Sequence, residues 1–195
     1  MPPPRALGRL LIALLVVDAA LAWMAIQGAL VFLEIVWRAL AGSDDWRSLV
    51  EAHARQFTGL RALEAGTWLV TAALFAGWLR RVRLALVLDG RLVGGTSPVR
   101  PWRLMLETWR AAVPRPVASR VPPLLGWWWG LAWLALALET WALVRLLAAG
   151  TALELGRGLM LALVASAVEI AVAVLTVFLV IGIQRGLVGP RPSRP

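Results

Sequence analysis

Four long apolar runs decide what this chain can fold into. They predict spans at about residues 10–33, 62–82, 122–146 and 159–184, each of the roughly 20 residues that a helix needs to cross the hydrocarbon core of a bilayer. The second is the least clean, because it has only fifteen uncharged residues, 65–79, and snorkelling arginines after them supply the missing length. Inside that core the backbone must satisfy its own hydrogen bonds, which a helix does. The sequence therefore predicts an all-α, polytopic membrane protein with four transmembrane helices in a single membrane domain, residues 1–195.

The composition supports a membrane location and excludes several kinds of site. Apolar residues make up 60% of the 195 residues. The chain has no cysteine, so disulfides, thiolate metal sites and cysteine nucleophiles are excluded. All 20 basic residues are arginine, which is typical of a GC-rich bacterial genome. We therefore expect the protein in a bacterial cytoplasmic (inner) membrane.

The arginines are concentrated between the second and third apolar runs. Residues 80–120 hold nine arginines against two acids, Asp89 and Glu107. If the loop at 83–121 and both termini lie on one side of the membrane, that side holds 14 of the 20 arginines. They are the nine arginines of residues 80–120, two before the first run and three in the tail 185–195. The positive-inside rule then places the loop and the N- and C-termini in the cytoplasm.

Two polar segments have the pattern of amphipathic helices, one for each side of the bilayer. In residues 43–64, apolar side chains recur at helical spacing opposite charged ones, after Ser43 as a helix cap. Residues 102–113 repeat this pattern, with tryptophans on one face and arginines on the other. We expect both segments to form interfacial helices that lie at the membrane surface.

The arginine-rich loop also predicts a binding surface. Arginines beside apolar spans suit anionic lipid, whereas nucleic-acid binding needs a solvated basic domain. The expected partners are therefore the lipid bilayer, its anionic headgroups and other membrane protein subunits, with no nucleic acid. The residues expected to bind lipid or a partner are Arg80, Arg81, Arg83, Arg100, Trp102, Arg103, Trp109 and Arg110.

The N-terminal region shares features with a secretory signal. Arg5 and Arg9 precede a short apolar block, and the tripeptide at residues 20–22, Ala-Leu-Ala, resembles a cleavage site. The apolar pattern continues for eleven residues beyond this tripeptide, to Leu33. This continuation favours a retained first helix over a cleaved signal.

Short motifs in the middle of the chain resemble those of one family. They are Gly77-Trp78-Leu79-Arg80-Arg81, Ser97-Pro98, Pro101 with Met105, Trp109-Arg110-Ala111 and Pro123-Leu124-Leu125-Gly126-Trp127-Trp128. Over about residues 60–133 the chain thus resembles the DUF4328 family of uncharacterised bacterial integral membrane proteins. Ala85 stands where the family has asparagine, and the segment before Pro101 is shorter. The resemblance implies a small multi-span membrane protein and supplies no catalytic residues.

Three acidic residues fall at membrane depth, where an ionised side chain is costly unless it is paired. They are Asp18, Glu139 and Glu169. Glu169 shares a helix face with Ala165 and Ser166, and Glu139 shares one with other small residues, so both should point into the bundle. Two interpretations stay open: a proton or cation relay, or neutral carboxyl groups whose hydrogen bonds fix the helix packing.

Small residues indicate where membrane helices approach each other closely. Gly126 and Gly130 have GxxxG spacing, and Ala165 with Ser166 forms a second candidate packing face. Alternatively, the two glycines act as hinges around the three tryptophans at 127–129.

The sequence contains no convincing cofactor, metal or catalytic site. His53 is the only histidine and a weak candidate ligand, and a packing role at the membrane surface accounts for it more simply. No zinc-ligand spacing, phosphate-binding loop or dinucleotide fingerprint is present. We expect no cofactor.

Function is predicted mainly from this absence of a site. The leading hypothesis is a non-enzymatic structural, scaffold or regulatory component of a larger membrane protein assembly. One alternative is a small transporter or proton or cation channel that uses Asp18 and Glu169. Another is a lipid-acting enzyme that uses Arg80, Arg81 and Asp89 at headgroup level.

Overall fold

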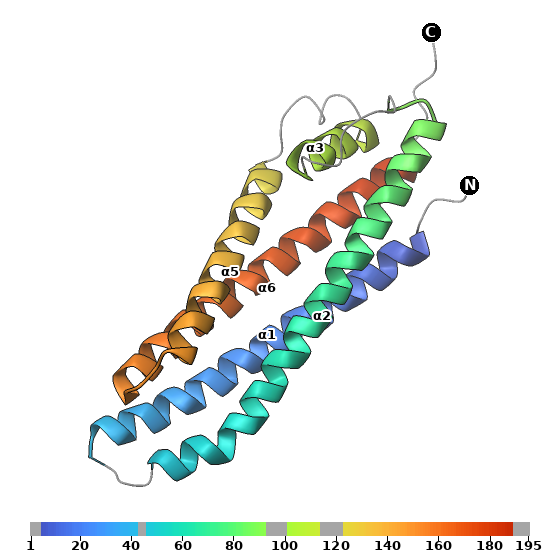
Figure 1. Ribbon diagram of the computed structural model, residues 1–195. Helices are drawn as coiled ribbons and strands as arrows, with labels where there is room; N and C mark the ends of the chain where they lie inside the picture. The colour runs from blue at the N-terminus through green and yellow to red at the C-terminus, as the bar shows by residue number, and fades with distance from the viewer. Residues whose placement is uncertain (1–4, 43–45, 93–100, 114–122, 189–195) are drawn as a thin grey trace. The chain divides into compact units, whose positions relative to one another are not determined.

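A computed structural model describes residues 5–42, 46–92, 101–113 and 123–188 of the protein. These residues form five α-helices and no strand: α1 (Arg5–Leu40), α2 (Trp46–Leu88), α3 (Pro101–Ala112), α5 (Pro123–Leu147) and α6 (Ala152–Val188) (Figure 1). Four of them, α1, α2, α5 and α6, are long and apolar enough to cross a membrane. The predicted all-α class with four membrane-spanning helices is thereby confirmed.

The helices are longer than the apolar runs that predicted them. α2 has 43 residues and α6 has 37. At 1.5 Å per residue these are about 64 Å and 55 Å long, against a hydrocarbon core of about 30 Å. Charged residues end an apolar run but do not end a helix, so the helices continue into the polar flanks.

Local signals set several helix ends. α1 and α2 are followed by Gly42 and Gly90, whose positive φ angles of 88° and 67° suit a residue without a Cβ. At the start of α6, the Glu154 carboxylate accepts hydrogen bonds from the N–H groups of Gly150 and Thr151, and Thr151 Oγ1 accepts one from the Glu154 N–H. This reciprocal pair is a capping box.

The described residues form two compact units, and each long helix contributes to both. Unit 1 contains residues 5–15 of α1, 70–88 of α2, all of α3, 123–129 of α5 and 175–188 of α6. Unit 2 contains residues 16–40 of α1, 46–69 of α2, 130–147 of α5 and 152–174 of α6.

In unit 2, residues 46–64 are not the separate surface helix that the sequence predicts. They are the first part of α2, which contains no proline. Their apolar face packs on α1: the ring centroids of Phe57 and Phe32 are 5.1 Å apart, and a Cβ added at Gly28 would lie 3.0 Å from the Phe57 ring. The apolar face is thus covered by protein rather than by lipid.

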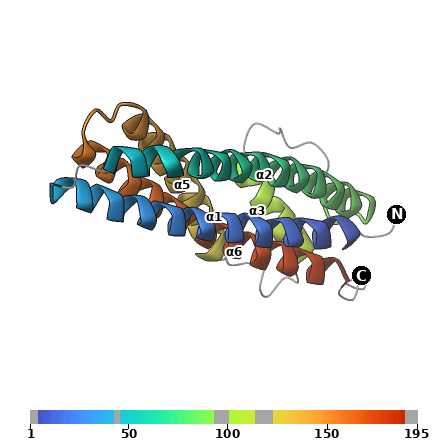
Figure 2. The same ribbon diagram turned by 90° about the horizontal axis from the view of Figure 1, so that it is seen from below.

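In unit 1, α3 packs against the end of α6 (Figures 1 and 2). Its side chains Met105, Thr108, Trp109 and Ala112 are at most 8% exposed. The expectation that the apolar face of this helix lies on lipid is therefore wrong for Trp109. A neighbouring helix offers the same apolar surface as a bilayer and adds close packing, so the face is buried in protein.

Two glycines of α6 make this close packing possible. A Cβ added at Gly182 would lie 2.9 Å from the Trp109 ring, and one added at Gly186 would overlap the Ala112 backbone. Gly182 and Gly186 have GxxxG spacing. At Gly126 and Gly130, by contrast, an added Cβ would meet no described atom within 4 Å. The GxxxG pair that faces a neighbouring helix is therefore the C-terminal one.

Candidate functional site

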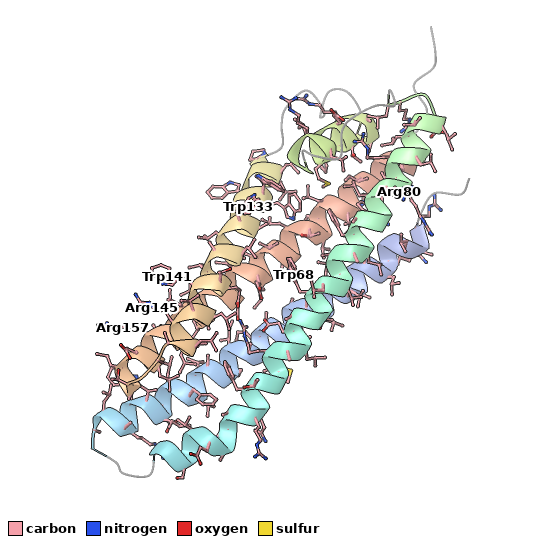
Figure 3. All side chains as sticks on the ribbon, in the orientation of Figure 1. Trp68, Arg80, Trp133, Trp141, Arg145 and Arg157 are labelled. Carbon is pink, nitrogen blue, oxygen red and sulfur yellow. The ribbon has the colours of Figure 1, made fainter. Side chains whose placement is uncertain are left out.

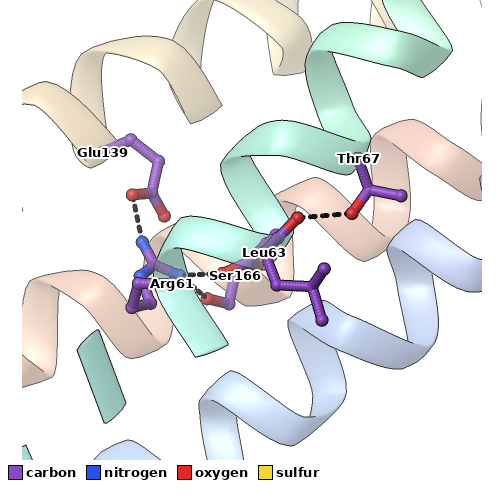
Figure 4. A network of polar contacts seen from close by, with 6 residues as sticks. Arg61, Leu63, Thr67, Glu139 and Ser166 are labelled. Atoms are coloured by element: carbon purple, nitrogen blue, oxygen red, sulfur yellow. Dashed lines mark hydrogen bonds and ion pairs between the residues drawn. The ribbon is translucent and has the colours of Figure 1, made fainter. Parts of the chain in front are cut away.

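Polar side chains from three helices meet in unit 2. Arg61 of α2 donates hydrogen bonds through Nη1 to Glu64 Oε2, at 2.5 Å, and to Ser166 Oγ of α6, at 3.2 Å. Its Nη2 pairs with Glu139 of α5 (Figure 4). Glu169, three residues after Ser166 on α6, is close enough to Arg61, Glu64 and Glu139 for their charges to act on it. We call these five residues the Arg61 cluster.

The spacing along each helix explains how the cluster forms. Arg61 and Glu64 are three residues apart on α2, and Ser166 and Glu169 are three apart on α6, so each pair shares one helix face. Ala165 beside them on α6 is fully buried. Small side chains on this face leave room for the longer glutamate and arginine side chains of the neighbouring helices.

Burial differs between the members of the cluster. Ser166 is 1% exposed and Glu64 is 7% exposed. The side chains of Arg61 and Glu139 keep 22% and 24% of their surface exposed. The cluster therefore has an interior side at Glu64 and an outer side at the Arg61–Glu139 ion pair.

Arg61 does not satisfy every oxygen atom around it. Oε1 of Glu64 and Oε1 of Glu139 are buried, and neither accepts a hydrogen bond from an N–H or hydroxyl group. The cluster holds three carboxyl groups and one guanidinium group, so one positive charge faces up to three negative charges. Such groups carry a high cost in a low-dielectric environment unless a proton or a partner compensates for them.

The structure brings together two of the three acidic residues that the sequence singled out. Glu139 and Glu169 both belong to the Arg61 cluster, and Ser166 accepts a hydrogen bond within it. Asp18 is half-buried on the part of α1 that belongs to unit 2.

Arg61 was missed because it precedes the predicted second span, 62–82, and Glu64 was missed because it lies at the start of that span, before the uncharged run from Ala65. The sequence contained one signal for Arg61. An ionised acid inside a membrane needs a nearby cation, and Arg61 stands at the start of the second span.

His53 has a packing role in unit 2. Its Nδ1 lies 2.9 Å from the carbonyl oxygen of Leu49, which can only accept, so Nδ1 carries the proton. Its ring meets Phe32 edge-on, with centroids 6.3 Å apart. Within the described part of the chain, no group of three or more His, Asp or Glu side chains is arranged to hold a metal ion.

The arginines expected to bind lipid or a partner fall into two groups in unit 1. Arg80 and Arg81 on α2 and Arg103 and Arg110 on α3 are exposed, and we call these four the arginine face (Arg80 is labelled in Figure 3). Arg83 is different, because its side chain is only 14% exposed and Nη1 lies 3.3 Å from Leu104 O and 3.5 Å from Glu107 Oε2.

Arg83 thus ties α3 to α2. Arg91 reaches α6, where its Nη1 donates to Gly186 O at 3.2 Å. Arg100 and the side chain of Trp102 lie outside the described residues.

Comparison with known proteins does not identify a relative of this chain. The chain matches no protein-family model, no curated protein and no solved structure. The resemblance to DUF4328 stays a prediction.

Proposed function

We propose that the protein is a non-enzymatic component of a larger membrane assembly and that a membrane helix of another protein covers the outer side of the Arg61 cluster. The observation that carries this proposal is the partial exposure of the Arg61–Glu139 ion pair, at 22% and 24%, on helices apolar enough to cross a membrane. Lipid chains offer no hydrogen bonds to these groups, so their exposed parts are costly in a bilayer.

A partner helix removes this cost better than lipid does. Polar side chains that cross between membrane helices hydrogen-bond to each other and hold the helices together. Leu136 and Leu143, one turn before and one turn after Glu139, are 49% and 57% exposed. The surface around the ion pair is therefore an apolar helix face with a polar centre, which suits a helix that presents one polar residue.

Site-specific crosslinking tests this proposal. A photoreactive amino acid at Leu143 lies on the Glu139 face of α5, whereas one at Leu134 lies about 140° round the helix from Glu139. Leu134 is 46% exposed and is therefore a matched control. We expect Leu143 to capture one defined membrane protein in intact membranes and Leu134 to capture it much less.

The polar centre is tested in the same experiment. Glu139→Gln keeps the shape of the side chain but removes its charge, so the Leu143 crosslink should fall several-fold. Equal capture from both positions, or a yield that Glu139→Gln leaves unchanged, would contradict the proposal. Capture of a second copy of this chain alone would replace it with self-assembly.

We further propose that the arginine face attaches unit 1 to anionic lipid. Each arginine near an anionic surface contributes about 1 kcal/mol, so replacing Arg103 and Arg110 with alanine should weaken binding by about 2 kcal/mol, roughly 30-fold. Retention of anionic lipid by the purified protein, measured by native mass spectrometry, checks this. Arg145 and Arg157, both exposed in unit 2 (Figure 3), give the control pair. An equal loss in both pairs would mean that the attraction is not specific to the arginine face.

A further inference from the structure

We propose that the partner helix presents a basic side chain, lysine or arginine, to Glu139 on the outer side of the Arg61 cluster. This inference rests on the proposed docking of a membrane helix there, and it goes further because it states the charge that the partner carries. It follows from the charge balance of the cluster, from carboxylate oxygens that lack a donor, and from the position of Glu139 on α5.

The ion pairs of the cluster leave one negative charge in excess. Arg61 pairs with Glu64 through Nη1 and with Glu139 through Nη2. One guanidinium group thus serves two carboxylates, and among the described residues it is the only cation that forms an ion pair with either of them. A net charge inside a membrane is costly unless an opposite charge balances it. The cluster therefore lacks one cation.

The other described arginines of unit 2 do not supply this cation. Arg38 pairs with Glu34 at 2.6 Å, and both side chains are mostly exposed. Arg55, Arg145 and Arg157 are exposed, and no ion pair joins them to the cluster in the part of the chain that the structure describes. A second protein is therefore the source that we infer for the balancing charge.

The carboxylates of the cluster also lack hydrogen-bond donors. Oε1 of Glu64 and Oε1 of Glu139 are buried and accept no hydrogen bond. Glu64 is only 7% exposed, whereas the side chain of Glu139 keeps 24% of its surface exposed. The last torsion of a glutamate side chain is broad, so Glu139 can turn its second oxygen toward a neighbouring helix. A lysine or arginine there would donate to this oxygen and balance the charge.

A neutral polar residue fits the same place less well. Serine, asparagine or glutamine can donate a hydrogen bond to Glu139, but the excess negative charge would stay in the membrane. A basic residue is stabilised in turn, because its own charge is costly in an apolar span that has no acid beside it. Each helix thus removes a cost from the other, which makes the pairing selective.

The position of Glu139 favours a helix over lipid headgroups as the source of the charge. α5 has 25 residues, and Glu139 lies eight residues before its end at Leu147, about 12 Å along the helix axis. Charged headgroups stay at the membrane surface, whereas a membrane helix carries its side chains to this depth. The expected partner therefore has one basic residue inside an otherwise apolar span.

Binding of synthetic membrane helices to the full chain in phosphatidylcholine vesicles tests the proposal. Each helix is a Leu–Ala segment of about 24 residues with lysine, glutamine or leucine eight residues from one end, to match the depth of Glu139. A fourth helix has its lysine at the end and is the control of equal charge. Energy transfer to a dye on Leu147→Cys, a position that is 79% exposed, reports binding.

We expect the inner-lysine helix to bind about tenfold more tightly than the glutamine helix or the end-lysine helix, which is the size of strong polar contacts between membrane helices. Glu139→Gln should abolish this preference, because Arg61 then faces Glu64 alone. Glu34→Gln is the matched control, since it removes an exposed acid of the same unit and should leave the preference unchanged. The comparison among helices in the wild-type chain stands even if Glu139→Gln does not fold.

Equal binding of the inner-lysine and glutamine helices would overturn the basic residue. The Leu143 crosslink reports docking whatever residue the partner presents, so it separates this failure from failure of the proposed function. A lysine preference that survives Glu139→Gln, or that the end-lysine helix shares, would also overturn the proposal, because the charge would then act elsewhere.

Discussion

Replacing Arg61 with methionine is expected to destabilise the protein by about 3 kcal/mol, because removal of one partner from a buried ion pair leaves the other charges uncompensated. Methionine keeps most of the length and apolar surface of the side chain, so the change removes mainly the charge and the hydrogen bonds. Arg61 holds Glu64, Glu139 and Ser166 together. Its loss would leave three carboxyl groups with no cation among them.

Unfolding of the purified protein in mild detergent measures this effect. Arg38→Met is the matched control, since Arg38 forms an i,i+4 ion pair with Glu34 whose side chains are 60% and 64% exposed. An exposed pair of this kind contributes less than about 1 kcal/mol. If both variants lost the same stability, the Arg61 cluster would have no special role in holding unit 2 together.

A multiple variant separates loss of the ion pairs from loss of packing. Glu64→Gln and Glu139→Gln remove the negative charges that Arg61 neutralises, while keeping the side-chain shapes. Added to Arg61→Met, they should recover most of the lost stability, because neutral amides cost far less to bury than carboxylates. A triple variant as unstable as Arg61→Met alone would show that the guanidinium group acts through its packing.

The apolar runs predict the membrane-spanning helices well, because the preference of each side chain for lipid over water can be read directly from the sequence. Glu139 and Glu169 could be expected to point inward, because small residues recur beside them at helical spacing. Arg61 could not be identified in the same way as the cation that lies beside these two glutamates. It lies 78 residues from Glu139 and 105 from Ser166, and only the fold brings these residues together.

The amphipathic segments show a different limit of prediction from sequence. An apolar helix face is stabilised when water is removed from it, and either lipid or protein can do this. The patterns at residues 43–64 and 102–113 therefore predict helices with one apolar face but not what covers it. For α3 the missing information was in α6, where Gly182 and Gly186 provide a surface flat enough for Trp109 and Ala112.

Replacing Gly186 with valine is expected to detach α3 from α6. An added Cβ would overlap the carbonyl of Ala112, with the carbonyl carbon 2.8 Å away, and would lie 3.3 Å from the Cα of Val113. These are backbone atoms, so no side-chain rotation can relieve the overlap. Forced overpacking costs about 1–3 kcal/mol. That range corresponds to a rise of about 5-fold to 150-fold in the open population of a docked 12-residue helix.

Cysteine labelling measures the detachment, because the chain has no cysteine of its own. Thr108 of α3 is fully buried, so Thr108→Cys should react slowly with a water-soluble maleimide in the otherwise native chain. With Gly186→Val the labelling rate should rise about tenfold, following the open population. Gly77→Val in α2 is the control, since an added Cβ there would meet no described atom within 4 Å. Unchanged protection of Cys at 108 in the Gly186→Val chain would mean that α3 shifts along α6 and stays docked, because α3 also keeps its contacts to Arg83.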